Sequence, residues 1–444
     1  MRLLYRLYRL ISGLRYWAQR RFSRAGWFVL CALMITGLMG LDTENSAAYQ
    51  GFTLLLFVLG VAICFSWLFR TRFSATRVLP RFGTAGYPMD YTVVVQNLSS
   101  KAQSGLTLLE ELVDPRPSFK EWRAVKMAEE KHLRPFRVSR GRRKTSFKVA
   151  RIGKGEVPQT LPNEQSEVRL QLTPLRRGVL RFSAVTLARP DPFGLFRALS
   201  KVPLPQKTLI LPKRYPLPPI TFPGAMRYQQ GGVALASRVG QSEEFVALRD
   251  YRPGDALRHI HWRSWAKAGK PVVKEFEDEF FVRHALVLDT FIDHPQSEVF
   301  EEAVSVAASF ACAIQTQGSL LDLLFVGAQA YCFTTGRGLA HGDQMLEILA
   351  SVQSGCEQPF EILENLVLNH ARGVSGCICV LVAWDEARRN LVKKLRGLEV
   401  PVMVLVVVPA GQGRGVEPGP MRDEPGCFHV LEVGRVEEGL RKIK

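Results

Sequence analysis

The sequence predicts an α+β multidomain chain with an N-terminal transmembrane helical hairpin, a β-sandwich domain and a C-terminal α/β domain with a mostly parallel sheet. Three observations support this prediction. Two long apolar stretches lie near the N-terminus, short β-rich runs follow from about residue 73, and apolar strands alternate with helical segments from about residue 283. At 444 residues, the chain has room for two or three domains of roughly 150 residues each.

We therefore divide the chain into five parts. They are a basic amphipathic N-terminal helix (1–25), two transmembrane helices (26–70), a β-sandwich-like domain with a basic loop at 116–154 (71–205), a Pro/Gly-rich linker with a charged block (206–280), and the α/β domain (281–444).

The first 25 residues contain seven Arg and no Asp or Glu. Leucines recur in this segment at helical spacing, as at Leu3, Leu7, Leu10 and Leu14. This pattern is typical of an amphipathic helix that lies on a membrane surface. The formal net charge of +18 likewise suggests an anionic partner. We therefore expect the N-terminal segment to contact membrane lipids.

Two apolar stretches, at about 26–41 and 47–69, are separated by the acidic segment 42–45. The second is long enough to cross the hydrocarbon layer of about 30 Å, and the first is nearly so. Arg residues precede the pair and follow it directly, and basic residues favour the cytoplasmic side of a membrane. The sequence therefore predicts a two-pass protein with cytoplasmic N- and C-termini.

Short runs rich in β-branched and aliphatic residues extend from about residue 73 to residue 205, and Gly, Pro, Asn and Ser interrupt them. This spacing predicts a small β-sandwich that ends at the corner 191–196. Inside it, the basic loop 116–154 carries fourteen Lys or Arg and three Glu. Such a loop is either simply solvated or attracted to the anionic inner leaflet. A Pro-rich connection, 211–223, follows the sandwich.

Apolar runs alternate with helical segments in the last third of the chain, and the principal runs are 283–289, 320–326, 377–383 and 402–408. This alternation predicts a parallel sheet covered by helices on both faces. In such sheets, ligands bind outside the carboxyl ends of the strands. The side chains expected at those ends include Asp289, Thr290 and Asp385.

Residues 243–277 concentrate charged and aromatic side chains. The candidate interaction residues are Arg249, Asp250, Tyr251, Pro253, Gly254, Asp255, Arg258, Trp262, Lys274 and Glu275. We expect a tight turn at Pro253 to Asp255, with Asp250 and Asp255 accepting hydrogen bonds from neighbouring arginines. Trp262 and Trp265 are expected to pack the block onto the α/β domain. This combination favours a structural clasp that also serves as a docking surface.

Two other functions remain open for the same block. Asp250, Asp255, His259 and His261 are suitable for metal-dependent hydrolysis, with both histidines on one face of a strand. No nucleophile elbow, phosphate loop, HExxH or CxxC pattern accompanies them. Arg and Lys interleaved with Trp and Tyr also suit nucleic acid, but the flanking acids would repel phosphate. We therefore expect a protein that interacts with other proteins, without catalysis of its own and without nucleic acid.

Four motifs resemble a known bacterial family. They are Asp-Pro-Phe-Gly-Leu-Phe at 191–196, Leu-Arg-x-Tyr-x-Pro-Gly-Asp at 248–255, Arg-x-Ile-x-Trp at 258–262 and Val-Lys-Glu-Phe-Glu at 273–277. In combination they are similar to the "domain of unknown function 58" (DUF58) proteins, and the resemblance extends over nearly the whole chain. It implies a membrane hairpin and a β domain before these signature motifs, a von Willebrand factor A-like domain after them, and a location in the bacterial inner (plasma) membrane.

The resemblance also implies partners. Members of the family are typically encoded beside MoxR-type AAA+ ATPases and transglutaminase-like membrane proteins. We therefore expect an inner-membrane scaffold or adaptor that docks a MoxR-type AAA+ ATPase or its client. A transglutaminase-like membrane protein is a further partner that the resemblance implies.

A metal site is the other property that the resemblance raises. Von Willebrand A domains hold Mg²⁺ with an Asp-x-Ser-x-Ser loop and with a Thr and an Asp from later loops, because a hard cation needs oxygen ligands. In this chain Phe291 interrupts the loop, and Asp293 replaces the second Ser. The ligands that remain are Asp289 and Asp293, together with Thr334, Thr335 or Asp385. They would form either an altered Mg²⁺ site or a vestigial one that shapes a partner surface, and we expect the vestigial form, with no cofactor.

Overall fold

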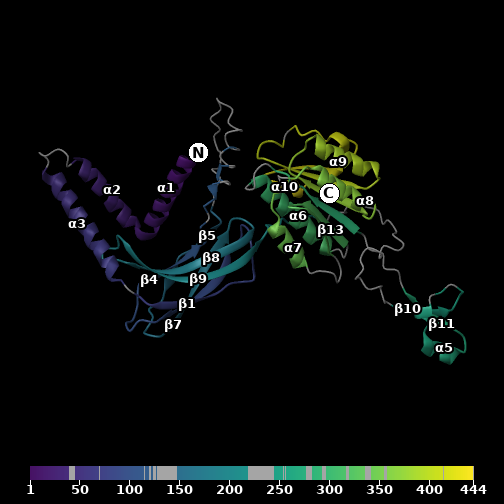
Figure 1. Cartoon of the computed structure of the whole chain (residues 1–444), viewed down its shortest axis with the longest axis horizontal. Helices are drawn as coiled ribbons and strands as arrows, with labels where there is room; N and C mark the ends of the chain where they lie inside the picture. Colours follow the sequence, from purple (N-terminus) through teal and green to yellow (C-terminus); the bar gives the residue numbers. More distant parts are fainter. Residues whose placement is uncertain are drawn as a thin grey trace. The chain divides into compact units, whose positions relative to one another are not determined.

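The computed structural model describes residues 1–39, 46–69, 71–114, 116–119, 122–123, 127, 148–218, 245–253, 255, 257–276, 283–292, 297–316, 320–335, 342–354, 358–413 and 415–443. The chain is an α+β multidomain protein with N-terminal helices, β-rich sandwich-like sheets and a C-terminal, mostly parallel α/β sheet (Figure 1). It divides into two compact units, made mainly of residues 1–213 and 214–444.

The N-terminal helices are α1 (Arg2–Arg21), α2 (Arg24–Met39) and α3 (Ser46–Leu68). Within the described part of the chain, one helix is long and apolar enough to cross a membrane: α3, over Ala47–Trp67. Although α2 is also apolar, its 16 residues extend for only about 24 Å at 1.5 Å per residue, less than the thickness of a hydrocarbon layer. Of the two helices expected to span a membrane, only the second thus has the length and composition to do so, and the acidic segment 42–45 lies outside the described residues.

Helix α1 has the predicted amphipathic character, but it also contacts the β domain. The hydroxyl of Tyr5 donates a hydrogen bond to the carbonyl of Pro117 at 3.0 Å, and its ring lies 5.4 Å from that of Phe119 and 5.6 Å from that of Trp122. Six aliphatic side chains of the helix remain 50–78% exposed: Leu3, Leu4, Leu7, Leu10, Ile11 and Leu14. The aromatic residues therefore attach α1 to the protein while its leucine stripe stays uncovered.

Two sheets form the β domain. In spatial order, the first sheet contains β1 (Phe73–Val78), β3 (Met89–Asn97), β7 (Gln165–Pro174) and β5 (Ala150–Ile152). The second sheet contains, in the same sense, β2 (Phe82–Thr84), β9 (Arg197–Leu211), β8 (Gly178–Pro190), β4 (Leu106–Leu112) and β6 (Gly155–Val157). Alternate residues of the strands are buried, as β7 illustrates, and they meet in a core that includes Val93, Leu108 and Phe182. Strand β9 continues past residue 205, where we expected the domain to end, because its last residues pair with the start of β8.

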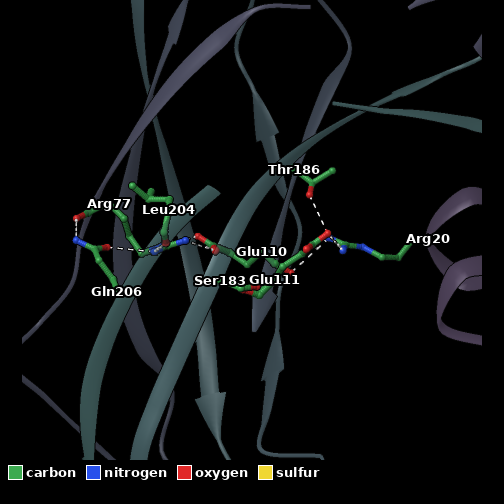
Figure 2. A network of polar contacts seen from close by, with 8 residues as sticks. All are labelled: Arg20, Arg77, Glu110, Glu111, Ser183, Thr186, Leu204 and Gln206. Atoms are coloured by element: carbon green, nitrogen blue, oxygen red, sulfur yellow. Dashed lines mark hydrogen bonds and ion pairs between the residues drawn. The ribbon is translucent and has the colours of Figure 1, made fainter. Parts of the chain in front are cut away.

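Two adjacent glutamates on β4 point in opposite directions, because successive side chains of a strand alternate between its faces (Figure 2). Glu110 is fully buried, and both of its oxygens accept from Arg77, at 3.0 and 2.6 Å. Burial raises the pKa of Glu110, and the Arg77 guanidinium opposes that rise. Glu111 instead accepts from Arg20 of α1, from Thr186 at 3.1 Å and from Lys201 at 2.5 Å. The second glutamate thus ties α1 to the sheet.

The corner between β8 and β9 adopts a compact, self-bonded turn. The carboxylate of Asp191 accepts from the backbone amides of Phe193 at 3.0 Å and Phe196 at 2.7 Å. Gly194 has a φ of +67°, a conformation that favours glycine. This arrangement explains why the corner needs both an Asp at its start and a Gly before Leu195.

The same corner also contacts the N-terminal helices. The amide of Ser23 donates to the carbonyl of Leu195 at 3.0 Å, and the rings of Phe22 and Phe196 meet edge to face at 5.1 Å. Gly26 lies so close that a Cβ atom there would be 2.1 Å from the oxygen of Leu195. Ala62 of α3 belongs to the same buried cluster. The corner therefore fixes the β domain to both α1 and α3.

The second unit contains the predicted α/β domain. Its six-stranded sheet has the order β14 (Ala330–Thr335), β13 (Leu320–Val326), β12 (Arg283–Leu288), β15 (Gly376–Leu381), β16 (Val402–Val408) and β17 (Phe428–Glu432), with β14 antiparallel to its neighbour and the other pairs parallel. The helices are α6 (Glu298–Thr316), α8 (Glu361–Ala371), α9 (Glu386–Gly397), α10 (Val436–Leu440) and the start of α7 (Gly342–Ser351), whose residues from Leu346 onward are grouped with the first unit.

The four parallel strands predicted for this domain are present, and their residues are almost completely buried. Helices α8 and α9 share one core cluster with alternate residues of the strands, while α6 packs against the same strands through residues outside that cluster. Strand β17 and helix α10 were not predicted. The reason is that only short 3₁₀ turns, at Gly419–Met421 and Pro425–Cys427, separate β17 from β16, so no helical pattern announced another strand.

Candidate functional site

The charged block forms a small structure of its own, which we call the signature hairpin (residues 245–276). Strands β10 (Phe245–Asp250) and β11 (Val272–Phe276) pair antiparallel, and between them lie the 3₁₀ helix η2 (Leu257–His259) and the helix α5 (Trp262–Ala268). Gly269, with a φ of +66°, ends α5 in the left-handed conformation. The chain can therefore return directly into β11.

A bidentate ion pair closes the turn of the signature hairpin. Arg249 donates to the two oxygens of Asp255 at 2.7 and 2.9 Å, and the amide of Arg252 donates to the same carboxylate at 2.9 Å. The Arg249 hydrogen bonds, followed by the one from the Arg252 amide, lower the pKa of Asp255 to about 2. The Asp255 amide also donates to the Arg252 carbonyl at 3.1 Å, as a tight turn requires. The predicted pairing with an arginine is present for Asp255, whereas the partner of Asp250 among the described side chains is Lys270. Asp255 therefore acts as an anionic clamp and is a weak base.

The other candidates for acid/base chemistry are also engaged in local contacts. Asp250 pairs with Lys270 at 2.7 Å, and both side chains are exposed. Nδ1 of His261 lies 2.7 Å from the hydroxyl of Ser264, at the start of α5. His259 ends η2, and His261 directly precedes α5. The expectation that both histidines share one face of a strand is therefore wrong.

The two tryptophans of the signature hairpin lie side by side on α5. Their rings stack on each other, with centroids 5.2 Å apart and planes inclined by 16°. Trp262 nevertheless remains 65% exposed. Positions 262 and 265 lie three residues apart on one short helix, so the two rings cover each other. Within the hairpin, Trp262 thus contacts Trp265, and its packing on the α/β domain stays a prediction.

The remaining signature residues support the hairpin itself or lie outside the described part. The amide of Tyr251 donates to the carbonyl of Pro271 at 3.0 Å, Pro253 is exposed in the turn, and Lys274 pairs with Leu248 across the strands. Gly254 and the side chains of Arg258 and Glu275 are outside the described residues.

A second cluster of polar side chains lies at the carboxyl edge of the α/β sheet. Asp289 follows β12 and is fully buried. Nε and Nη2 of Arg388 donate to its two oxygens at 3.0 and 3.2 Å, and the amides of Phe291 and Val382 donate at 3.0 and 3.2 Å. Nη1 of Arg388 also donates to Asp385, which caps α9 by accepting from the Arg388 amide at 3.1 Å. One guanidinium thus neutralises both aspartates.

Electrostatics agree with this geometry. Complete burial raises the pKa of Asp289, while the charge and hydrogen bonds of Arg388 act to lower it. Burial by itself lowers the pKa of Arg388, but Asp289 and Asp385 together hold it above its ordinary value. The Arg388 guanidinium also lies 4.5 Å from the ring centroid of Phe360. The Arg388 guanidinium is therefore occupied by two carboxylates and by the ring of Phe360.

These residues do not fit the altered magnesium site that we considered. Asp289 and Asp385 are both bonded to Arg388, and Asp293 lies outside the described residues. Thr334 and Thr335 pair with the start of β13, at the opposite edge of the sheet, because β14 runs antiparallel to it. Thr334 there donates to Asp322 at 2.6 Å. Among the described residues, no group of three or more His, Cys, Asp or Glu could hold a metal ion.

The central member of this cluster, Arg388, was not predicted from the sequence. A signal was present, because Asp385 and Arg388 stand three residues apart at a helix start, where an Asp caps and an Arg can turn back towards it. Nothing in the sequence indicated that the same Arg would reach Asp289, which lies 99 positions earlier in the chain.

The second unit thus consists of a two-stranded signature hairpin followed by a mostly parallel α/β sheet. Residues 247–393 match the family described as "Protein of unknown function DUF58", and this part of the chain is therefore a DUF58 family domain. A curated relative, "Uncharacterized protein YeaD" of Bacillus subtilis (strain 168), is 28% identical over 193 residues. That alignment covers 43% of this chain and 46% of the relative, so the chain spans about half the length of the relative that it matches.

Two solved structures have a weak similarity to part of this chain. An ASH/PapD-like domain of human CEP192 is 9% identical, with a TM-score of 0.17, over 32% of this chain and 86% of that domain. A cohesin module from a Clostridium perfringens family 33 glycoside hydrolase is 10% identical, with a TM-score of 0.15, over 32% of this chain and 98% of the module. Neither similarity is strong enough to bear on function.

Proposed function

We propose that this chain is a membrane-anchored scaffold or adaptor that docks a protein partner through its signature hairpin. The observation that carries the proposal is the stacked pair of Trp262 and Trp265, of which Trp262 is 65% exposed. Tryptophan is among the residues most enriched at the energetic centres of protein interfaces, because it contributes a large contact area with few rotatable bonds. A tryptophan that is two-thirds exposed on a helix of seven residues gains little from folding and is available to a partner.

The ion pair of Arg249 and Asp255 supports the same proposal. Arg249 and Asp255 close the turn that precedes η2 and α5, so the two tryptophans are presented on a preorganised support. Preorganisation lowers the entropy cost of binding. The carboxylates that a hydrolase would need are engaged with cations, Asp255 with Arg249 and Asp250 with Lys270, which favours docking over hydrolysis.

The N-terminal helices supply the anchor in this proposal. Helix α3 crosses the bacterial inner membrane, α2 makes the second pass with the help of residues that flank its 16-residue helix, and both termini face the cytoplasm. The exposed leucine stripe of α1 lies in the inner leaflet, where the arginines of the same helix meet anionic head groups. The resemblance to DUF58 proteins makes a MoxR-type AAA+ ATPase, or its client, the first partner to test. A transglutaminase-like membrane protein is the second.

The test uses the full chain in nanodiscs and the purified MoxR-type ATPase encoded nearest to its gene. We expect saturable binding that weakens at least tenfold, about 1.4 kcal/mol, when Trp262 is changed to Ala. Val179→Ala is the matched control, because Val179 is also an exposed apolar residue but lies on β8. Changing Asp255 to Asn should weaken binding through the clamp while the first unit keeps its melting temperature.

Two outcomes would contradict the proposal. Equal binding by Trp262→Ala and the wild-type chain would remove the role of the tryptophan pair, and failure of the wild-type chain to bind would exclude this ATPase as the partner. Salt-sensitive retention of single-stranded nucleic acid, abolished by Trp262→Ala, would instead assign the hairpin to nucleic acid.

A further inference from the structure

A hollow of about 510 Å³ lies at the carboxyl ends of β15 and β16, beside the closed Arg388 cluster. Its lining includes Trp384, Arg389, Val408, Pro409, Gln412 and Glu417. The volume is in the range of ligand pockets, and ligands of open α/β sheets bind at this edge. The hollow belongs to none of the sites described above.

One wall of the hollow is rigid. The indole nitrogen of Trp384 donates to the carbonyl of Glu417 at 2.7 Å, and the ring lies 5.1 Å from that of Phe428. Both contacts fix the orientation of the ring before any ligand arrives. Val408 and Pro409 add apolar surface, so the wall suits an aliphatic or aromatic side chain.

The charge of the hollow comes from Arg389. Its guanidinium carbon lies 5.9 Å from the ring centroid of Trp384, and the side chain is exposed. Arg388, the preceding residue, points inward and neutralises two aspartates. By contrast, Arg389 has no carboxylate partner within the part of the chain that the structure describes. A guanidinium held beside an indole and without a counter-ion is suited to a planar carboxylate, which it can bind through two parallel hydrogen bonds.

From these contacts we infer that the hollow binds an acidic peptide segment of a partner protein. The carboxylate of an Asp or Glu bonds to Arg389, and the apolar residue next to it packs on Trp384 and Val408. A volume of about 510 Å³ exceeds that of one side chain, which is why the ligand is a short segment and not a single carboxylate. This inference goes beyond the signature hairpin and uses none of its residues, so either proposal can fail while the other stands.

The test is ¹⁹F NMR of the full chain in detergent, labelled with 5-fluorotryptophan, with the Trp384 signal assigned through Trp384→Phe. The probes are the peptide acetyl-Leu-Glu-Leu-amide, its Gln counterpart and glutarate. We expect the Glu peptide to shift the Trp384 signal saturably, with at least tenfold weaker binding by the Gln peptide and by glutarate. Arg389→Ala should weaken binding of the Glu peptide about tenfold or more, and Arg389→Lys should lose less because it keeps the charge without the planar fork.

Two matched variants complete the test. Arg422→Ala removes an exposed arginine from the same domain and should bind like the wild-type chain. Glu417→Gln removes a negative charge from the lining and should tighten binding, since the carbonyl that holds Trp384 belongs to the backbone. An unshifted Trp384 signal at millimolar Glu peptide would overturn the inference, as would equal binding by Arg389→Ala at an unchanged melting temperature. Glutarate binding as tightly as the Glu peptide would overturn the peptide as ligand.

Discussion

Replacing Arg388 with Ala should strongly destabilise the α/β domain. The substitution removes the guanidinium that bonds both oxygens of Asp289, a side chain with 0% exposure, and also reaches Asp385 and the carbonyl of Phe291. Removing one partner of a buried ion pair costs about 3–5 kcal/mol, because the other charge is left without compensation. At about 2–4 °C for each kcal/mol in a domain of this size, the melting temperature should fall by about 6–20 °C.

The defect should depend on pH. Burial already raises the pKa of Asp289, and removal of Arg388 takes away the interactions that oppose this rise. A carboxyl group whose pKa is raised in the folded state favours folding at low pH, and that contribution is lost as pH increases through the folded pKa. The melting temperature of Arg388→Ala should therefore lie closer to that of the wild-type chain at pH 5 than at pH 8.

The assay is thermal melting of the full chain in detergent, with hydrogen exchange of the β12 and β15 amides to identify the domain that unfolds. Lys393→Ala is the matched control, because Lys393 is an exposed residue on the same helix and its removal should cost less than about 0.5 kcal/mol. Adding Asp289→Asn to Arg388→Ala should recover part of the loss, since the buried charge is then absent. Millimolar Mg²⁺ should leave the melting temperature of the wild-type chain unchanged.

Two results would refute this reasoning. If Arg388→Ala melts within about 2 °C of the wild-type chain with unchanged exchange in β12, the guanidinium is not needed to compensate Asp289. If Mg²⁺ stabilises the wild-type chain and protects β12 and β15, the carboxyl edge binds a cation in spite of Arg388, and the vestigial interpretation fails.

Two further predictions concern the contact of α2 with the corner and a buried histidine. Gly26→Ala places a Cβ atom 2.1 Å from the oxygen of Leu195, so it should separate α2 from the corner and speed proteolysis near residue 23. Gly60→Ala is the control and should not change proteolysis, because a Cβ atom there meets no atom within 4 Å. Equal proteolysis of the two variants would contradict the close contact. His284 is buried in β12, and burial lowers its pKa, so its contribution to stability is present above the unfolded pKa of about 6.5 and is lost as pH falls towards the folded value. Melting temperatures between pH 7 and 5 should therefore fall less in His284→Gln than in the wild-type chain, and parallel curves would argue against this role.

The α/β domain could be predicted closely from the sequence because burial on both faces leaves each strand as an uninterrupted apolar run. Its side-chain partners could not. Because β14 runs antiparallel to β13, Thr334 lies at the edge opposite to Asp289 and donates to Asp322. The threonine considered as a ligand of the altered metal site is therefore at the other edge of the sheet from Asp289.

For the signature hairpin, residue types were more informative than partners. The sequence indicated that Asp255 would pair with an arginine, and three arginines were available. The selection of Arg249 depends on the register of β10 and on the turn, which brings its guanidinium to both carboxylate oxygens. The stacking of Trp262 on Trp265 could not be predicted either, because a tryptophan that packs on its neighbour and one that packs on another domain have the same sequence pattern.

The corner at 191–196 decides how force passes through the first unit. Ser23 is hydrogen-bonded to Leu195, Phe22 packs on Phe196, and Gly26 touches the Leu195 carbonyl. A force applied to β8 and β9 is therefore transmitted directly to the start of α2 through the contacts of Ser23 and Gly26 with Leu195. In any membrane that α3 crosses, the β domain would keep one tilt relative to the bilayer normal, and load on that domain would become torque on the helices.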